Sequence, residues 1–389
     1  MFQILDSTLR EGEQTPGVYF SPETKLLIAQ YLDRIGIDII EVGNPAVSPE
    51  ISEAIALVAQ AKLNAKIGAH SLCRIDHVQK ALDCGIDFLG IFFSVAKHRL
   101  ERDYHITFDQ ALEQIVEVIR YAKAQNPNLL IRYTPEDATR TEIEQVIEVA
   151  TAAVQAGADI ISIADTTGYA TPFQPDRSYA YFVKTLKQKL ADLQLFPKIA
   201  VHCHNDRGLA LANALDAYKA GADIIDVSVI GLGERAGIVD LATLLVNLVE
   251  MGESKRRWEF KYLQELYHLV SQASRISIPP LFPIMGKNAF THYAGVHVTA
   301  IAKDPMLYQS LNLESLAHQN KLALGMQSGR NSIELALKQI GKEEMIENES
   351  LIKSILKEVK FLAKQGTLID IHNEFINLVN RCVAIENFE

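Results

Sequence analysis

One short pattern occurs four times in the first part of the chain and strongly limits the folds that it can adopt. Each copy consists of a glycine, a small or apolar residue, an aspartate and two apolar residues. The copies are Gly36–Ile40, Gly85–Leu89, Gly157–Ile161 and Gly221–Ile225. A glycine in this position can close a helix in the left-handed conformation, and the apolar run after it is typical of a strand buried on both faces. The pattern therefore predicts four helix-to-strand junctions.

Four further apolar runs complete a set of candidate strands. They are Phe2–Leu5, Lys66–Ala69, Leu129–Tyr133 and Lys198–Val201. All runs together predict eight strands, which start near residues 2, 38, 66, 87, 129, 159, 198 and 223. Eight strands that alternate with helices in about 250 residues predict an α/β fold, the (β/α)8 TIM barrel. A doubly wound sheet is the alternative, although no Gly-x-Gly-x-x-Gly motif follows the first strand.

Helix signals lie between the predicted strands. Apolar residues recur three or four positions apart, as in the segment from Phe108 to Ala122. Ser21-Pro22 and Thr171-Pro172 each place a capping hydroxyl before a first-turn proline. Thr107 precedes Gln110 at the spacing of a capping box. We therefore expect helices to begin after Ser21, Thr107 and Thr171.

The alternation of strands and helices stops after about residue 250. Amphipathic stretches near 257–275 and 350–380 flank a proline-rich hinge, Ile278–Pro283, and a segment rich in glycine and histidine, 286–297. We expect a catalytic barrel over 1–255, followed over 256–389 by mainly helical C-terminal subdomains that a linker joins to it.

Charge and composition exclude several classes of protein. The net charge of −10, from 48 acidic and 38 basic residues, argues against a nucleic-acid partner. The N-terminal residues do not resemble a signal peptide, and no window has the ~18 uncharged apolar residues that a membrane span needs. The four cysteines are scattered without a Cys-x-x-Cys pair, which argues against a disulfide framework or a thiolate zinc site. A reducing cytoplasm is the expected location.

Polar residues follow each predicted strand, at the end of a barrel where active sites are found. They are Arg10, Glu11, Asn44, His70, Ser94, Glu136, Asp165, Thr167, His202, His204 and Glu234. His202 and His204 are two apart on one predicted strand, so both imidazoles should face the barrel mouth. Glu11, expected on a neighbouring strand, adds a carboxylate. Two histidines and one carboxylate suit one divalent ion, Zn²⁺, Mn²⁺, Fe²⁺ or Mg²⁺.

Other interpretations of these residues remain open. The histidines can instead form a hydrogen-bonded pair at a strand end; if they bind a metal, Asn205 and Asp206 are expected to accept hydrogen bonds from them. Arg10 can pair with a buried carboxylate such as Glu41 or Glu136. It can also serve as a fixed cation that stabilises a developing oxyanion.

Five motifs together resemble the acyl-CoA-condensing metallo-barrel family, which contains the homocitrate, 2-isopropylmalate and citramalate synthases. The motifs are Asp6–Gln14, Asp165–Pro172, His202–Asp206, Gly231–Gly237 and Gly286–His297. The resemblance implies an acyltransferase that carries out a metal-dependent Claisen condensation of acetyl-CoA with a 2-oxo acid. It also implies a homodimer, in which the C-terminal region of one subunit reaches into the partner's site.

The resemblance assigns a role to each candidate residue. Glu11, His202 and His204 would bind the metal, and Arg10 would stabilise the enolate or the polarised keto oxygen. Proton transfer falls to Glu136, His297 and Tyr308. The residues assigned to substrate binding are Gln14, His70, Arg132, Thr134 and Thr167. Independently of the resemblance, Gln327–Arg330 is typical of a capped helix start, at which Arg330 is a candidate contact for the CoA phosphates.

The identity of the 2-oxo acid rests on a few positions. Glu11 after Arg10, and Arg132 with His70, resemble the homocitrate pattern, in which such groups hold the distal carboxylate of 2-oxoglutarate. An inward arginine is also a poor lining for an isopropyl group. Arg132 could instead pair with Glu136 or Glu11.

Several alternatives therefore stay open beside 2-oxoglutarate. The sequence Glu-Arg-Ala-Gly at 234–237 and Ile238 differ from the homocitrate or isopropylmalate patterns, so 2-oxoisovalerate and pyruvate remain possible acceptors. A related metal-barrel lyase and a non-catalytic metal-binding protein are the remaining alternatives. Because the chain ends at Glu389, we expect no leucine-binding regulatory domain.

Overall fold

The computed structural model describes residues 2–252, 258–314, 316–367 and 369–386. Its contacts divide the chain into two compact units, Met1–Ile278 and Pro279–Glu389. The boundary expected at residue 255 therefore falls inside the first unit. The reason is that α10 (Leu263–Ser274) packs on α1 (Pro22–Ile35) and belongs to the barrel.

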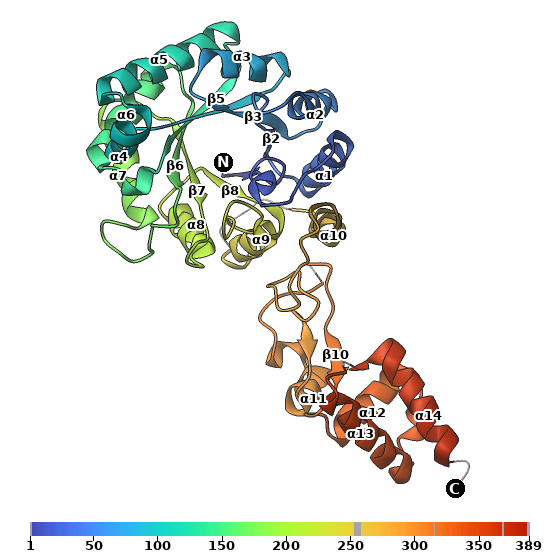
Figure 1. Cartoon of the computed structure of the whole chain (residues 1–389). Coiled ribbons are helices and arrows are strands. Elements are labelled where there is room, and N and C mark those ends of the chain that lie inside the picture. Colours follow the sequence, from blue (N-terminus) through green and yellow to red (C-terminus); the bar gives the residue numbers. More distant parts are fainter. Residues whose placement is uncertain (1, 253–257, 315, 368, 387–389) are drawn as a thin grey trace. The chain divides into compact units, whose positions relative to one another are not determined.

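The first unit is a closed barrel of eight parallel strands in sequence order (Figure 1). The strands are β1 (Gln3–Asp6), β2 (Ile39–Gly43), β3 (Lys66–Leu72), β4 (Phe88–Ser94), β5 (Leu130–Glu136), β6 (Ile160–Asp165), β7 (Lys198–Cys203) and β8 (Ile224–Val227). β8 pairs with β1 and closes the barrel, with Ile4 opposite Ile225. The predicted TIM barrel is confirmed, and the doubly wound alternative is wrong because its sheet would stay open.

Helices surround the strands of the barrel (Figure 1). Besides α1 and α10 they include α2 (Pro49–Gln60), α3 (Ile75–Asp83), α5 (Phe108–Gln125), α6 (Ile143–Ala156), α7 (Tyr179–Asp192), α8 (Ala210–Lys219) and α9 (Leu241–Glu250). The four junction glycines all have positive φ, between 75° and 117°, a region in which a side chain would be strained. The repeated pattern thus marks the points where the chain leaves a helix and enters the barrel.

Two of the three predicted helix starts are confirmed. Ser21 caps α1, and Thr107 and Gln110 form both hydrogen bonds of a capping box at the start of α5. The prediction for Thr171 is wrong, since the helix begins at Tyr179 and is capped by Ser178. The amide of Thr171 donates to the Arg177 carbonyl, so Thr171 closes a turn instead.

The barrel interior changes from apolar to charged along the strands. One layer is formed by apolar side chains and consists of Leu5, Ile39, Phe88, Ile160, Ala200 and Ile224. Two residues further along their strands lie the buried side chains of Glu41, Arg132 and Asp226, from β2, β5 and β8. The apolar layer therefore supports a charged cluster nearer the carboxyl ends of the strands.

The second unit is mainly helical, as expected, but it also contains a small sheet. Its helices are α11 (Gly295–Lys303), α12 (Arg330–Gln339), α13 (Glu349–Lys364) and α14 (Ile376–Glu386). The sheet has the order β11 (Ile369–Asp370), β10 (Lys321–Leu324), β9 (Thr291–His292). The stretch predicted over 350–380 is thus broken into two helices. In the described part of the chain, no helix is long and apolar enough to cross a membrane.

Candidate active site

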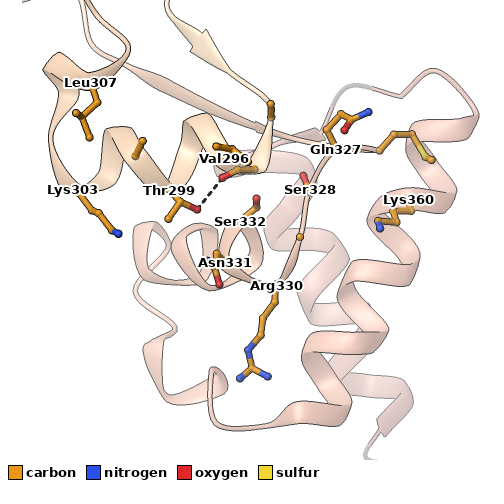
Figure 2. A pocket seen from close by; sticks show the side chains of 15 residues that line it. Val296, Thr299, Lys303, Leu307, Gln327, Ser328, Arg330, Asn331, Ser332 and Lys360 are labelled. Atoms are coloured by element: carbon orange, nitrogen blue, oxygen red, sulfur yellow. Dashed lines mark hydrogen bonds between the residues drawn. The ribbon is translucent and has the colours of Figure 1, made fainter.

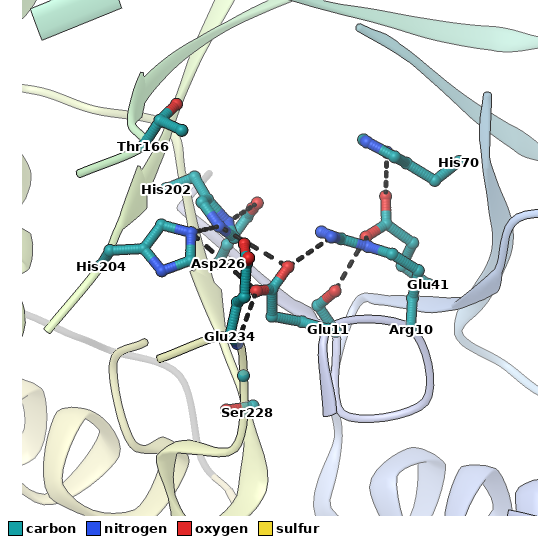
Figure 3. Close-up of polar contacts among 12 residues, drawn as sticks. Arg10, Glu11, Glu41, His70, Thr166, His202, His204, Asp226, Ser228 and Glu234 are labelled. Carbon is teal, nitrogen blue, oxygen red and sulfur yellow. Dashed lines mark hydrogen bonds and ion pairs between the residues drawn. The ribbon is translucent and has the colours of Figure 1, made fainter. Parts of the chain in front are cut away.

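The three predicted metal ligands meet inside the barrel, although they come from distant parts of the chain (Figure 3). Glu11 lies in the turn after β1, His202 on β7, and His204 just after β7. The two Nε2 atoms are 3.3 Å apart, and each lies 3.9 Å from a carboxylate oxygen of Glu11. The expectation that Glu11 and the histidines come from neighbouring strands is wrong, because β8 lies between β1 and β7.

This donor set fits a divalent ion. Metal–ligand bonds of about 2.0–2.2 Å place adjacent ligand atoms roughly 3.0–3.5 Å apart, so a small movement of Glu11 completes the group. Burial works to raise the pKa of Glu11, but Arg10 and the two histidines lower it to about 2. Burial, and then His202, lower the pKa of His204 to about 4. Near neutral pH both groups are therefore in the forms that bind metals.

Asp226 orients His202 from below. Its Oδ2 lies 3.0 Å from Nδ1 of His202, which leaves Nε2 facing Glu11 and His204. The residues expected in this role lie elsewhere: Asp206 accepts from Arg235 at 2.6 Å, and Asn205 accepts from the amide of Ala210. That expectation was wrong. A signal for Asp226 does exist in the sequence, namely a lone acid inside the apolar run of β8.

Arg10 is a fixed cation beside the metal ligands. Its Nε donates to Glu41 at 2.7 Å, and its Nη1 pairs with Glu11. Burial works against the charge, but Glu41 and then Glu11 raise the pKa of Arg10 above its usual range. The two interpretations of Arg10 are thus compatible, with Glu41 rather than Glu136 as the buried partner.

Arg132 links the two halves of the charged cluster. It is 1% exposed; Nη1 donates to both oxygens of Asp226, at 2.9 and 3.0 Å, and Nη2 donates to Glu41 at 3.0 Å. The alternative pairing with Glu136 or Glu11 is therefore wrong. Three carboxylates and two guanidinium groups leave the cluster with one excess negative charge, which favours binding of a cation.

The predicted substrate residues lie around this cluster. His70 stacks on Phe92, with ring centroids 4.6 Å apart, and its Nδ1 lies 3.1 Å from Glu41. Thr134 is buried, and its Oγ1 has no hydrogen-bond partner among the described residues. With its amide nitrogen turned inward, Gln14 lies 3.1 and 3.2 Å from the two oxygens of Glu11. Thr167 is half-buried in the loop after β6.

The three predicted proton-transfer residues lie in different units. Glu136 ends β5, where burial raises the pKa of its carboxyl group despite an ion pair of 3.2 Å with Arg99. In the second unit the rings of His297 and Tyr308 lie 4.2 Å apart, and both residues are exposed. The structure thus brings His297 and Tyr308 together. Arg99, the partner of Glu136, was not predicted from the sequence. It lies in the short helix Lys97–Arg99 after β4, and not directly at the end of a predicted strand.

Comparison with known proteins agrees with this geometry. Residues 1–270 match the family model described as HMGL-like. The chain belongs to this family. Residues 284–367 match a second model, described as homocitrate synthase post-HMGL domain-like. These matches confirm the resemblance found in the sequence, and the chain is an acyl-CoA-condensing transferase.

Individual relatives fall into two groups by name. A homocitrate synthase of Pyrococcus abyssi is 42% identical over 92% of this chain and 94% of its own length. A probable 2-isopropylmalate synthase of Ignicoccus hospitalis is 35% identical over 94% of this chain and 88% of its own. Among solved structures, an HMG-CoA lyase of Bacillus subtilis matches with a TM-score of 0.59 and 24% identity, over 72% of this chain and 95% of its own. This last likeness concerns the fold alone.

Proposed function

We propose that the chain condenses acetyl-CoA with 2-oxoglutarate and releases homocitrate and CoA, with one divalent ion, Zn²⁺, Mn²⁺ or Mg²⁺, at Glu11, His202 and His204. The observation that carries this proposal is the convergence of these three ligands beside Arg10 in a barrel of the HMGL-like family. Further support comes from the second unit, which matches the homocitrate synthase post-HMGL model. The proposed place of action is the cytoplasm, in keeping with four free cysteines.

The barrel residues prepare the 2-oxo acid for attack. When bound, the ion supplies Lewis-acid polarisation of the keto group. Arg10 uses Nε and Nη1 for the two carboxylates, which leaves Nη2 for the oxygen that becomes negative. Because Glu41 and Glu11 hold the guanidinium in place, little reorganisation is needed as that charge develops.

Proton transfer is assigned to three residues. The methyl group of acetyl-CoA loses a proton, its carbon forms a bond to the keto carbon, and water then cleaves the thioester. Glu136 is the proposed base, because a carboxylate with a raised pKa accepts a proton more readily. His297 and Tyr308 are proposed to come from the partner subunit of a homodimer and to protonate the alkoxide oxygen.

Three groups are proposed to recognise the distal carboxylate of 2-oxoglutarate. Thr134, on β5, offers a buried hydroxyl that lacks a partner in the described structure, and His70, on β3, is held by Glu41. Arg132 supplies the positive charge beneath them. Gln14 and Thr167 are left to hold the carboxylate next to the keto group.

One observation favours a second acceptor, 2-oxoisovalerate. Both terminal nitrogens of Arg132 are already bound to Asp226 and Glu41, so its charge is largely compensated before any substrate enters. Under this alternative Arg132 only supports the barrel interior. The probable 2-isopropylmalate synthase of Ignicoccus hospitalis, at 35% identity, is consistent with it.

Release of CoA from acetyl-CoA separates the two acceptors. The metal-loaded enzyme is assayed with 2-oxoglutarate, 2-oxoisovalerate and pyruvate in turn. We expect the highest kcat/KM for 2-oxoglutarate, and we expect Thr134→Val, which leaves the buried ion pairs intact, to lower it more for 2-oxoglutarate than for pyruvate. A clear preference for a monocarboxylic acceptor would contradict the proposed substrate.

A further inference from the structure

The second unit contains a cavity that the condensation site does not use (Figure 2). Its volume is about 890 Å³, and its walls include the first turns of α11 and α12 and a side chain from α13. This volume is enough for a small organic ligand. Its lining combines apolar side chains, such as Val296 and Leu307, with polar and cationic groups that can bind an anion.

Both helices begin at the cavity without a side-chain cap. α11 follows Ala294 and α12 follows Gly329, and neither residue forms a side-chain capping bond. The first-turn amides of a helix have no partner within the helix, and the positive end of the helix dipole attracts anions. Gly295 and Asn331, from the two first turns, both line the cavity. Two helix starts therefore face one space.

A buried hydroxyl group supplies an independent sign of a ligand. Ser332 is 1% exposed, and its Oγ has no hydrogen-bond partner among the described residues. Ser332 lines the cavity beside Asn331, as Figure 2 shows. An unpaired buried hydroxyl costs free energy, and a bound acceptor at this point would remove that cost.

The charged residues of the lining are all cationic. They are Lys303, Arg330 and Lys360. Arg330 forms ion pairs with Glu334 and Glu349, whereas Lys303 and Lys360 form none with the described residues, so these two lysines carry the free positive charge of the lining. This concentration of positive charge stands out in a chain whose net charge is −10.

The loop between β10 and α12 is held in place around the cavity. The amide of Gly295 donates to the carbonyl of Gln327 at 3.3 Å, and the amide of Gly325 donates to Oγ of Ser328 at 2.9 Å. A Cβ atom on Gly295 would lie 3.2 Å from the Gln327 oxygen and 3.3 Å from Oγ of Ser332. The close approach that glycine allows keeps the donors of both helix starts together.

We propose that this cavity binds the phosphate group of a small molecule. The donors are the first-turn amides of Val296 in α11 and Asn331 in α12, Oγ of Ser332, and the ammonium groups of Lys303 and Lys360. The phosphate belongs either to coenzyme A or to a separate phosphorylated ligand. The inference goes beyond the condensation proposed above and does not depend on its acceptor.

Isothermal titration calorimetry on the full-length, metal-loaded protein tests the proposal with inorganic phosphate and adenosine 3′,5′-bisphosphate as probes. We expect both to bind, and Lys360→Ala and Ser332→Ala each to weaken binding about tenfold, the effect of one lost hydrogen bond to a charged group. Lys357→Ala is the matched control, because Lys357 lies on the same helix, is exposed and does not line the cavity. It should leave both affinities unchanged.

Competition then identifies the source of the phosphate. If CoA displaces the bisphosphate more strongly than dephospho-CoA does, the ligand is coenzyme A; if neither displaces it, the site takes a separate phosphorylated molecule. Lack of binding by both probes, or equal binding by wild type and Lys360→Ala, would overturn the proposal. Metal content and turnover are recorded for the same samples, so a failure of the condensation proposal is seen separately.

Discussion

At the scale of single residues, the candidate site depends on buried charges that compensate one another. Glu41 is the centre of this arrangement, since it accepts hydrogen bonds from Arg10, Arg132 and Ser7. Burial works to raise the pKa of Glu41, but Arg10, His70 and Arg132 hold it well below its usual range. A change at one member of the cluster should therefore affect the metal ligands, even where the member does not touch the metal.

Asp226→Asn tests this dependence. The substitution keeps the shape of the side chain but removes the charge that orients His202 and pairs with Arg132. We expect metal affinity to fall by about 10–100-fold, the usual effect of losing such a support. Competition with a chelating dye measures the affinity. Asp206→Asn is the control, because Asp206 pairs with Arg235 instead, and an equal loss in both variants would contradict the assigned role.

A second residue-scale prediction concerns the pH dependence of stability. Asp6 is fully buried, and burial raises its pKa to about 7, compared with the ordinary 3.8. The carboxyl group of Asp6 therefore binds a proton more tightly in the folded than in the unfolded state. The resulting stabilisation of the folded state is complete below about pH 4 and is lost as pH rises towards 7. Between pH 5 and pH 8 the titration of Asp6 should lower the free energy of unfolding of the wild type by about 2–3 kcal/mol, and Asp6→Asn should lack this decrease.

Urea unfolding of wild type and Asp6→Asn in the presence of a chelator measures this difference. Trp258, the single tryptophan, is buried in the first unit and reports on the barrel. The comparison is made between the two proteins because His204, with a lowered pKa, changes stability in the opposite direction in both. Parallel pH profiles for the two proteins would show that Asp6 does not hold a proton in the folded state.

The residues of the site were only partly predictable from the sequence. Glu11, His202 and His204 were found because they belong to motifs and follow predicted strands. Asp226 was missed because its partners, Arg132 and His202, lie on other strands and meet it only inside the barrel. Arg99 was missed because its partner Glu136 lies on the next strand of the barrel. Arg132 was correctly placed inside the barrel, but its two partners could not be identified without the register of the strands.

At the scale of elements, a glycine in β4 makes room for the cluster. A Cβ atom on Gly90 would lie 2.9 Å from Nδ1 of His70 and 3.2 Å from Oε1 of Glu41. Gly90→Ala should therefore push His70 away from Glu41 and lower the free energy of unfolding by about 1–3 kcal/mol, as expected for overpacking. We also expect KM for the 2-oxo acid to rise. Unchanged stability and KM would contradict this account of β4.

The strands were more predictable than the loops. The glycine–aspartate junctions and apolar runs placed the starts of all eight strands within one residue, because buried parallel strands are continuous apolar segments, whereas several strands extend further at their carboxyl ends. The helix predicted after Thr171-Pro172 is absent at this point, because the same residue types that begin a helix also begin a turn. The two-residue strands β9 and β11 are too short to leave a periodic signal.

At the scale of the whole molecule, the proposed homodimer predicts complementation between two inactive variants. His204→Ala damages the barrel site, and His297→Ala damages the second unit. If the second unit completes the partner's site, a random mixture of the two variants regains about a quarter of wild-type activity, because half the dimers then have one intact site. The two variants are co-expressed with different affinity tags, and the CoA-release assay measures the activity of the resulting mixture. A mixture as inactive as its components would show that each chain completes its own site.

The central claim is that Glu11, His202 and His204 hold one divalent ion that binds the 2-oxo acid. Anomalous diffraction from crystals grown with Mn²⁺ or Zn²⁺ and 2-oxoglutarate tests it most directly. We predict one peak per chain, about 2.0–2.2 Å from Nε2 of both histidines and from an oxygen of Glu11, with the keto acid bound to it. A peak elsewhere, or none at these three residues, would contradict the claim.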